Sequence, residues 1–215
     1  MAKDLSNYRK SYEREELLEV NCPENPMELF QTWFRNADES KTVEETNAMS
    51  ITTIGTDGYP KTRVVLLKKF TWEGFIFYTN YTSEKGNAIT NNPNVCLSFF
   101  WPTLEQQIII KGKAEKLSKN LSDSYFESRP KGSQLGAWAS NQSSIVASKE
   151  ALKNNMDSLE KAFQNKTVPR PEHWGGYLIK PISIEFWQGR PNRLHDRIRY
   201  TLEEGFSWKM ERLAP

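Results

Sequence analysis

The chain has 215 residues, which suits a single domain with a buried core. Its 29 Lys and Arg residues nearly balance 27 Asp and Glu residues, so the net charge of +2 does not favour a nucleic acid or a membrane surface as partner. No apolar run reaches the length of a membrane span. Residues 1–18 are densely charged and lack the apolar segment of a signal peptide, so we expect a cytoplasmic protein.

Several common catalytic motifs are absent from the sequence. Two His residues cannot form HExxH, and Cys22 and Cys96 are too few and too far apart for a zinc knuckle or a CxxC redox pair. P-loop, GxGxxG and GxSxG motifs do not occur. We therefore expect no metal, and any cofactor must be held by another arrangement of residues.

The first half of the chain is predicted to form an arm, a helix and a β-meander. Residues 1–20 resemble a charged, partly helical arm, with a frayed terminus as the alternative. Pro26 suits the first turn of a helix, and Met27, Phe30 and Trp33 follow at helical spacing. Strands are expected at 48–54, 60–70, 75–79, 95–101 and 106–117, with a short helix at 83–92.

The second half is predicted to contain helices and then strands. Helices are expected at 121–128 and 148–164, with a loop or short helix at 136–144. Strands are expected at 174–185, 198–202 and 206–213. Because no regular alternation of strand and helix appears, a doubly wound sheet is disfavoured. The order favours a mainly β protein (α+β), an antiparallel barrel with flanking helices.

Two places in this order are suited to phosphate. Lys85 falls in the first turn of the helix that Ser83 is expected to cap, where free N–H groups favour anions. Tyr125 and Arg129 lie four residues apart on one helix face, with Ser133 just beyond. Each set has a simpler interpretation, a solvated cation for Lys85 and an ordinary surface pair for Tyr125 and Arg129.

The stretch from Trp187 to Arg197 carries three basic side chains after a turn marked by Gly189 and Pro191. In an extended strand, Arg193, His195 and Arg197 would share one face, because residues two apart point the same way. This pattern favours a site for an anionic, planar ligand. The alternative is a basic β-hairpin edge that discourages aggregation.

Several motifs in one order resemble those of the pyridoxine (pyridoxamine) 5′-phosphate oxidase family, nearly from end to end. They are RVVLLK at 63–68, FYTN at 77–80, SRP at 128–130, SQLGAW at 133–138, QSS at 142–144, WGG at 174–176, EFWQ at 185–188, RLHDR at 193–197 and RLAP at 212–215.

This resemblance implies a split β-barrel and a homodimer with FMN at the interface. Residues 1–20 would form a flexible arm that can close over the substrate, and residues 21–215 a single FMN-binding domain. Arg63 and Lys85 would hold the FMN phosphate. The implied FMN contacts are Arg63, Val64, Val65, Leu66, Leu67, Lys68, Tyr78, Thr79, Lys85, Gln107, Gln142, Ser143, Trp187 and Arg197.

The implied reaction oxidises pyridoxine or pyridoxamine 5′-phosphate to pyridoxal 5′-phosphate with O2, releasing H2O2, and NH3 from the amine. Arg193 and His195 are the implied catalytic residues, placed against the pyridine ring. The implied substrate contacts are Arg9, Lys10, Ser11, Tyr12, Lys68, Tyr125, Arg129, Ser133, Arg193, Leu194 and His195. The alternatives are a flavin reductase-like split-barrel enzyme and a non-catalytic module that binds FMN or pyridoxal phosphate.

One residue departs from the pattern. Family members often carry a basic residue immediately before the position of Lys85, where this chain has Glu84. A carboxylate beside a phosphate site weakens it by repulsion, unless the side chain points away or stabilises a helix N-terminus.

Overall fold

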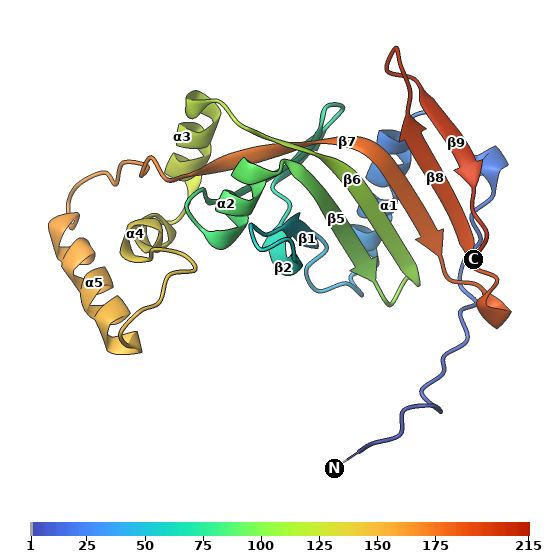
Figure 1. Ribbon diagram of the computed structural model, residues 1–215, viewed down its shortest axis with the longest axis horizontal. Helices are drawn as coiled ribbons and strands as arrows, with labels where there is room; N and C mark the ends of the chain where they lie inside the picture. Colours follow the sequence, from blue (N-terminus) through green and yellow to red (C-terminus); the bar gives the residue numbers. More distant parts are fainter. Residues whose placement is uncertain (1) are drawn as a thin grey trace. The chain divides into compact units, whose positions relative to one another are not determined.

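The computed structural model describes residues 2–215, in which strands outnumber helices (Figure 1). The helices are α1 (Pro26–Ser40), α2 (Glu84–Asn91), α3 (Lys119–Ser128), α4 (Lys131–Ala139) and α5 (Lys149–Ala162), with 3-10 turns η1 (Glu19–Asn21) and η2 (Pro191–Arg193). The strands are β1 (Ala48–Ile54), β2 (Pro60–Leu66), β3 (Lys69–Thr71), β4 (Gly74–Asn80), β5 (Asn94–Trp101), β6 (Gln106–Lys116), β7 (Trp174–Gln188), β8 (Asp196–Leu202) and β9 (Trp208–Arg212).

Side-chain caps fix where the helices begin. The side chain of Asn25 accepts the N–H of Met27 ahead of α1, and Pro26 occupies the first helical position. Ser83 caps α2 by accepting the N–H of Gly86, which confirms the predicted cap. These polar residues satisfy N–H groups that have no partner inside the helix.

The strands pair in the order β2-β1-β5-β6-β7-β4-β3, with β8 between β7 and β9. The β3–β4, β4–β7, β7–β8 and β8–β9 pairs are antiparallel. The single strand expected at 60–70 is instead two strands, because the chain bends at Leu67 and Lys68. Leu67 is buried, and Lys68 donates its N–H to Ile76 O at 2.8 Å.

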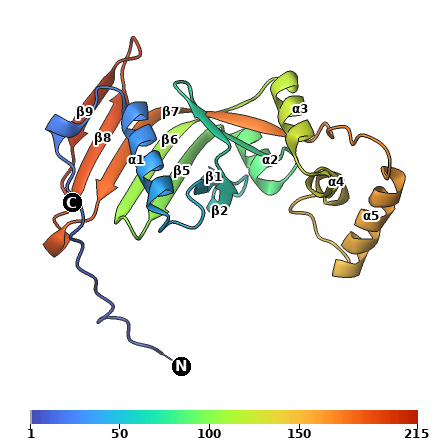
Figure 2. The same ribbon diagram turned by 180° about the vertical axis from the view of Figure 1, so that it is seen from behind.

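The chain divides into two compact units, and β1, β5, β6 and β7 contribute residues to both. Unit 1 comprises Met1–Ser50, Leu97–Lys111 and Pro181–Pro215. In it, α1 lies on one face of the strands (Figure 2), where Phe30 meets Phe99 at 5.4 Å and Trp33 meets Phe186 at 5.2 Å between ring centroids. These aromatic side chains form the core of the unit.

Unit 2 comprises Ile51–Cys96 and Gly112–Lys180. Its helical part has a core of Phe126, Leu135, Val168 and Trp174, against which Tyr78 and Tyr125 pack, along with residues of α5. The β4–β7 register pairs Tyr78 with Gly176 and Asn80 with Trp174. This pairing brings the FYTN and WGG motifs side by side.

The expected helical character of the arm is wrong. Residues 2–18 form no helix, and their predicted apolar face is too thin to stabilise one. The arm is instead held in part through its main chain, since Glu13 and Arg14 donate N–H groups to Glu105 and Leu17 donates to Asp196.

The expectation that Arg193, His195 and Arg197 share one strand face is also wrong. Pro191 begins the 3-10 turn η2, and Asn192 and Arg193 have φ angles of 57° and 62°, in the left-handed region. β8 starts only at Asp196. The alternation of strand side chains therefore does not extend back to Arg193.

Among residues 2–215, no helix is both long enough and apolar enough to cross a membrane. The same residues contain no group of three or more His, Cys, Asp or Glu side chains arranged to hold a metal ion. The cytoplasmic location stays a prediction.

Candidate functional site

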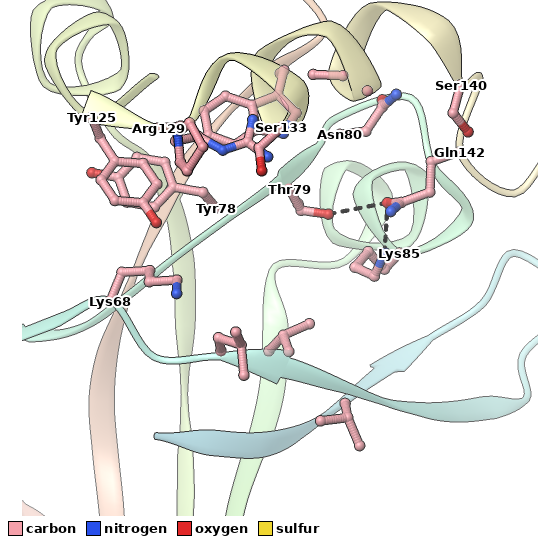
Figure 3. A pocket seen from close by; sticks show the side chains of 17 residues that line it. Lys68, Tyr78, Thr79, Asn80, Lys85, Tyr125, Arg129, Ser133, Ser140 and Gln142 are labelled. Carbon is pink, nitrogen blue, oxygen red and sulfur yellow. Dashed lines mark hydrogen bonds between the residues drawn. The ribbon is translucent and has the colours of Figure 1, made fainter. Parts of the chain in front are cut away.

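Unit 2 contains a cavity of about 560 Å³ in which many of the predicted site residues meet (Figure 3). Strand β2, the bend at Lys68, strand β4, and helices α2, α3 and α4 all contribute to it. The predicted residues that line it are Val64, Val65, Leu66, Lys68, Tyr78, Thr79, Lys85, Tyr125, Arg129, Ser133 and Gln142.

A stack of aromatic rings positions Arg129 in this cavity. The rings of Tyr78 and Tyr125 lie 3.8 Å apart at 19°, and Trp174 lies 5.6 Å from Tyr78 at 12°. The guanidinium of Arg129 lies 4.4 Å from the centre of Trp174, within the range of a cation–π interaction. The stack thus holds the Arg129 guanidinium in the cavity that Tyr125 also lines.

Arg129 has hydrogen-bonding capacity that the protein leaves unused. Within residues 2–215, its Nη1 is buried and has no hydrogen-bond partner. Burial lowers the pKa of Arg129, which Tyr125 partly offsets. A buried donor without a partner costs free energy, and an anion in the cavity would supply the missing acceptor.

Lys85 is a buried cation of the same cavity. Its side chain donates to Gln142 Oε1 at 2.8 Å, and the same oxygen accepts from Thr79 Oγ1 at 3.2 Å (Figure 3). Burial lowers the pKa of Lys85, and repulsion from Arg63 lowers it further, with Glu84 opposing. An anion near Lys85 and Arg63 would relieve both effects.

Arg63 lies beside this cavity rather than in its lining. Its Nη1 donates to Thr53 Oγ1 at 2.7 Å and to the carbonyl of Lys61 at 2.6 Å. Burial lowers the pKa of Arg63, and Glu84 opposes the shift. Neutral acceptors therefore hold the side chain near Lys85, and no carboxylate among residues 2–215 forms a direct ion pair with it.

The charge of Glu84 is compensated by Lys61. Lys61 Nζ lies 2.7 Å and 2.6 Å from the two carboxylate oxygens, and both side chains are about half exposed. Ser83, not Glu84, supplies the helix cap. The ion pair directs the carboxylate to Lys61, so its repulsion of a bound phosphate is reduced.

Unit 1 contains a second cavity, of about 860 Å³, formed by the arm and the turn after β7. Predicted substrate residues of the arm, Arg9 to Tyr12, line it together with Arg193 and His195. Leu194 is 68% exposed and does not line this cavity.

His195 has a defined hydrogen-bonding state. Its Nδ1 accepts the backbone N–H of Arg190 at 3.1 Å, which requires this nitrogen to be unprotonated. The neutral ring then carries its proton on Nε2 and can donate from there. Burial lowers the pKa of His195 and repulsion from Arg193 lowers it further, while Asp196 opposes the shift.

The remaining predicted residues lie outside both cavities. Trp187 contacts Tyr12 edge-on at 5.7 Å, and Arg197 donates to Glu185 at 2.8 Å and to the Ala214 carbonyl at 2.9 Å. Gln107 is half-buried in β6. Leu67 is buried, and Ser143 is exposed in a left-handed conformation with φ of 73°.

Sequence reasoning missed several residues that shape these cavities. Trp174 belongs to the WGG motif, but only the structure shows that the Arg129 guanidinium packs on its ring. Arg190 lines the second cavity, and Glu105 holds the arm beside it. No local pattern marks Glu105, because its partners lie about 90 residues away in the sequence.

Two protein-family models match the chain. The model described as pyridoxamine 5′-phosphate oxidase matches residues 37–161, and that of the pyridoxine 5′-phosphate oxidase C-terminal dimerisation region matches residues 174–215. The chain belongs to the pyridoxine/pyridoxamine 5′-phosphate oxidase family. This is a family of FMN-dependent oxidoreductases, so the chain is an enzyme with FMN as its cofactor.

Curated relatives agree over the full length. The pyridoxine/pyridoxamine 5′-phosphate oxidase of Flavobacterium psychrophilum is 63% identical over 213 residues, covering 99% of this chain and 100% of the relative. The enzyme of the same name from Cyanothece sp. is 47% identical over 215 residues, covering 100% of each.

Solved structures place the fold. PhzG from Burkholderia lata 383, in complex with tetrahydrophenazine-1-carboxylic acid, has a TM-score of 0.87 at 30% identity, covering 94% of this chain and 99% of that chain. An FMN-binding protein from Nostoc punctiforme related to pyridoxamine 5′-phosphate oxidase has a TM-score of 0.68 at 13% identity, covering 91% and 100%. These similarities confirm the predicted class, an FMN-binding split β-barrel with flanking helices.

The cavity of unit 2 suits the phosphate chemistry of FMN and of a phosphorylated substrate. It combines two buried cationic groups, Lys85 and the unpaired Nη1 of Arg129, with the more exposed Lys68. Hydroxyl and amide groups from Tyr125, Ser133 and Gln142 complete the donor set. Donors of these types recognise phosphate oxygens.

We predict that His195 titrates below the ordinary histidine value of about 6.5. NMR of the imidazole signals would measure this, with His173→Gln identifying the other histidine. Arg193→Ala should raise the His195 pKa by removing repulsion. Because its folded-state pKa is lowered, His195 should make folding less favourable as the pH falls through 6.5. A titration midpoint above 7 in the wild type would contradict the neutral ring.

Proposed function

We propose that this chain oxidises pyridoxine 5′-phosphate and pyridoxamine 5′-phosphate to pyridoxal 5′-phosphate, with O2 as the final acceptor. The products would include H2O2, and NH3 from the amine. The family membership supports this reaction. The observation that carries it is the cavity in which buried Lys85 and half-buried Arg129 are accompanied by Lys68, because these cations suit two phosphate groups.

The two phosphates are proposed to occupy different parts of the cation set. Arg63 and Lys85 would hold the FMN phosphate, since burial disfavours the charged state of both and Arg63 also repels Lys85 until an anion binds. Lys68, Arg129 and the hydroxyls of Tyr125 and Ser133 would hold the substrate phosphate. The stack under Arg129 would keep this anchor in one orientation.

FMN supplies a two-electron acceptor when bound. The residues of the chain would bind the substrate phosphate, which is remote from the reacting carbon. Holding the phosphate would position that carbon for the reaction. Neutral His195 would donate from Nε2 to a polar substituent of the pyridine ring, and Arg193 would supply positive charge beside it. An orienting role is favoured over that of a base, because Nδ1 is already occupied by the N–H of Arg190.

The remaining FMN contacts are proposed to come from the β2 residues Val64–Leu66, from Thr79 and Gln142, and from Gln107, Trp187 and Arg197 in unit 1. We propose a homodimer with FMN at its interface, which the match of residues 174–215 to a dimerisation region supports. Residues 1–20 would act as an arm over the substrate and residues 21–215 as one FMN-binding domain.

The substrate-phosphate assignment predicts the effect of Arg129→Ala. Losing charge-assisted hydrogen bonds costs about 1.5–3 kcal/mol, so KM for pyridoxine 5′-phosphate should rise about 10- to 100-fold with little change in kcat. Arg129→Lys should be intermediate, because Lys keeps the charge but loses the planar, stacked donor. Steady-state H2O2 release measures both. An unchanged KM in the alanine variant would remove Arg129 from the phosphate site.

The catalytic assignment predicts that Arg193→Ala lowers kcat while FMN binding is unchanged. Arg193 lines the unit 1 cavity, whereas the proposed FMN phosphate cations belong to unit 2. We expect a loss of about 10-fold or more, typical of a missing charged contact. FMN absorbance after gel filtration and rapid-mixing reduction of the flavin measure the two quantities. Full turnover in this variant would exclude Arg193 from the reaction.

A further inference from the structure

Glu105 is a buried carboxylate in an uncommon backbone conformation. It ends the turn at 102–105, between β5 and β6, with φ of 58°, and its side chain is 5% exposed. Non-glycine residues adopt this left-handed region rarely. The conformation is held because the Glu105 carbonyl accepts from Gly189 N at 2.7 Å and from Gln188 Nε2 at 3.2 Å.

The carboxylate of Glu105 binds the main chain of the arm, and these contacts with residues 10–14 are called the Glu105 grip below. Its Oε2 accepts the N–H groups of Glu13 at 2.8 Å and Arg14 at 3.1 Å, and Lys10 Nζ lies 3.4 Å from Oε1. Burial alone would raise the pKa of Glu105, but the Arg14 and Glu13 N–H groups and Lys10 outweigh it, so the pKa lies below its usual range. The group is therefore an anion at neutral pH.

This grip places Tyr12 against the substrate side of unit 1. The ring of Tyr12 lies 5.7 Å from Trp187 and 5.8 Å from His195, both edge-on. Gly189 makes room for it, since a Cβ there would lie 2.7 Å from Tyr12 Cγ and 3.1 Å from Glu105 Cβ. Residues 8–12 lie on the N-terminal side of Glu13 and Arg14, and they line the same cavity as Arg193 and His195.

A separate set of contacts holds the arm further along the chain. Leu17 donates its N–H to Asp196 at 3.1 Å, and Arg212 binds the Leu17 carbonyl at 2.7 Å and the Glu19 carboxylate. Arg190 donates to the Glu15 carbonyl at 3.0 Å. Loss of the Glu105 grip would thus free the residues before about 15, while residues 15–19 keep their own anchors.

We propose that Glu105 is a positioning residue that holds residues 10–14 of the arm beside Trp187 and His195, and so completes the substrate half of the site. The inference rests on the proposed function for its effect on substrate, but not for its effect on the arm. Glu105 touches neither reacting group. It acts through the main chain of Glu13 and Arg14, so the hold does not depend on the side chains of those two residues.

Glu105→Asn tests the proposal. Asn tolerates the left-handed conformation and preserves the turn, but it is uncharged and one methylene too short to reach the arm. In the FMN-loaded enzyme, hydrogen exchange of peptides spanning residues 8–18 should accelerate about 10-fold or more, because the lost hydrogen bonds are charge-assisted. KM for pyridoxine 5′-phosphate should rise about 10-fold with FMN content unchanged.

Two further variants make the result interpretable. Glu105→Gln keeps the length and one acceptor oxygen, and should give a smaller change in both readouts; it also serves if the Asn variant does not fold. Glu13→Gln, an exposed carboxylate-to-amide change at a residue that Glu105 binds through the main chain, should leave both readouts at wild-type values.

Exchange that stays at the wild-type rate in the Glu105 variants would overturn the grip itself. Faster exchange with unchanged KM would overturn the positioning role. If wild-type enzyme failed to oxidise the substrate, the proposed function would fail, and the exchange measurement would still decide whether Glu105 holds the arm.

Discussion

The burial of positive groups in and beside one cavity is the constraint on which the proposed site depends. Burial disfavours the charged state of Lys85 and of Arg63, and repulsion from Arg63 adds to the effect on Lys85. Arg129 adds a buried donor with no partner among residues 2–215. Such an arrangement is unfavourable without an anion, and we propose that a bound phosphate offsets this cost.

The surrounding structure explains how these charges are held in place. The Arg129 guanidinium packs on the ring of Trp174. Trp174 stacks with Tyr78, and Tyr78 in turn stacks with Tyr125. Antiparallel pairing of β4 with β7 provides this stack, because it sets Tyr78 opposite Gly176, two residues from Trp174 on the neighbouring strand. The neutral acceptors around Arg63 and the ion pair that Lys61 makes with Glu84 keep carboxylates from cancelling the site's charge.

Features encoded by adjacent residues were predictable from sequence. Strand β1 has the predicted bounds, and Ser83 caps α2 as expected, because both depend on local pattern and local hydrogen bonds. Tyr125, Arg129 and Ser133 line one cavity as expected. The expected helix face is wrong for Arg129, which follows the end of α3 in an extended conformation. The family resemblance predicted the fold class, which structural similarity confirms.

Features set by distant contacts were not predictable. The bend at Lys68 depends on a hydrogen bond to Ile76, and the turn at Arg193 on two left-handed residues that a strand pattern does not reveal. Glu105 has partners across the sequence, and so does the arm that it holds. In each case tertiary hydrogen bonds override the local preference of the chain.

The central claim is that one site binds FMN and a phosphorylated pyridine together and transfers electrons between them. The most direct measurement mixes FMN-loaded protein anaerobically with one equivalent of pyridoxine 5′-phosphate and follows the visible absorbance of the oxidised flavin. The account predicts bleaching of the flavin with formation of an equivalent amount of pyridoxal 5′-phosphate, and release of H2O2 when O2 is admitted. Flavin that stays oxidised with pyridoxine 5′-phosphate but is reduced by NADH or NADPH would contradict it.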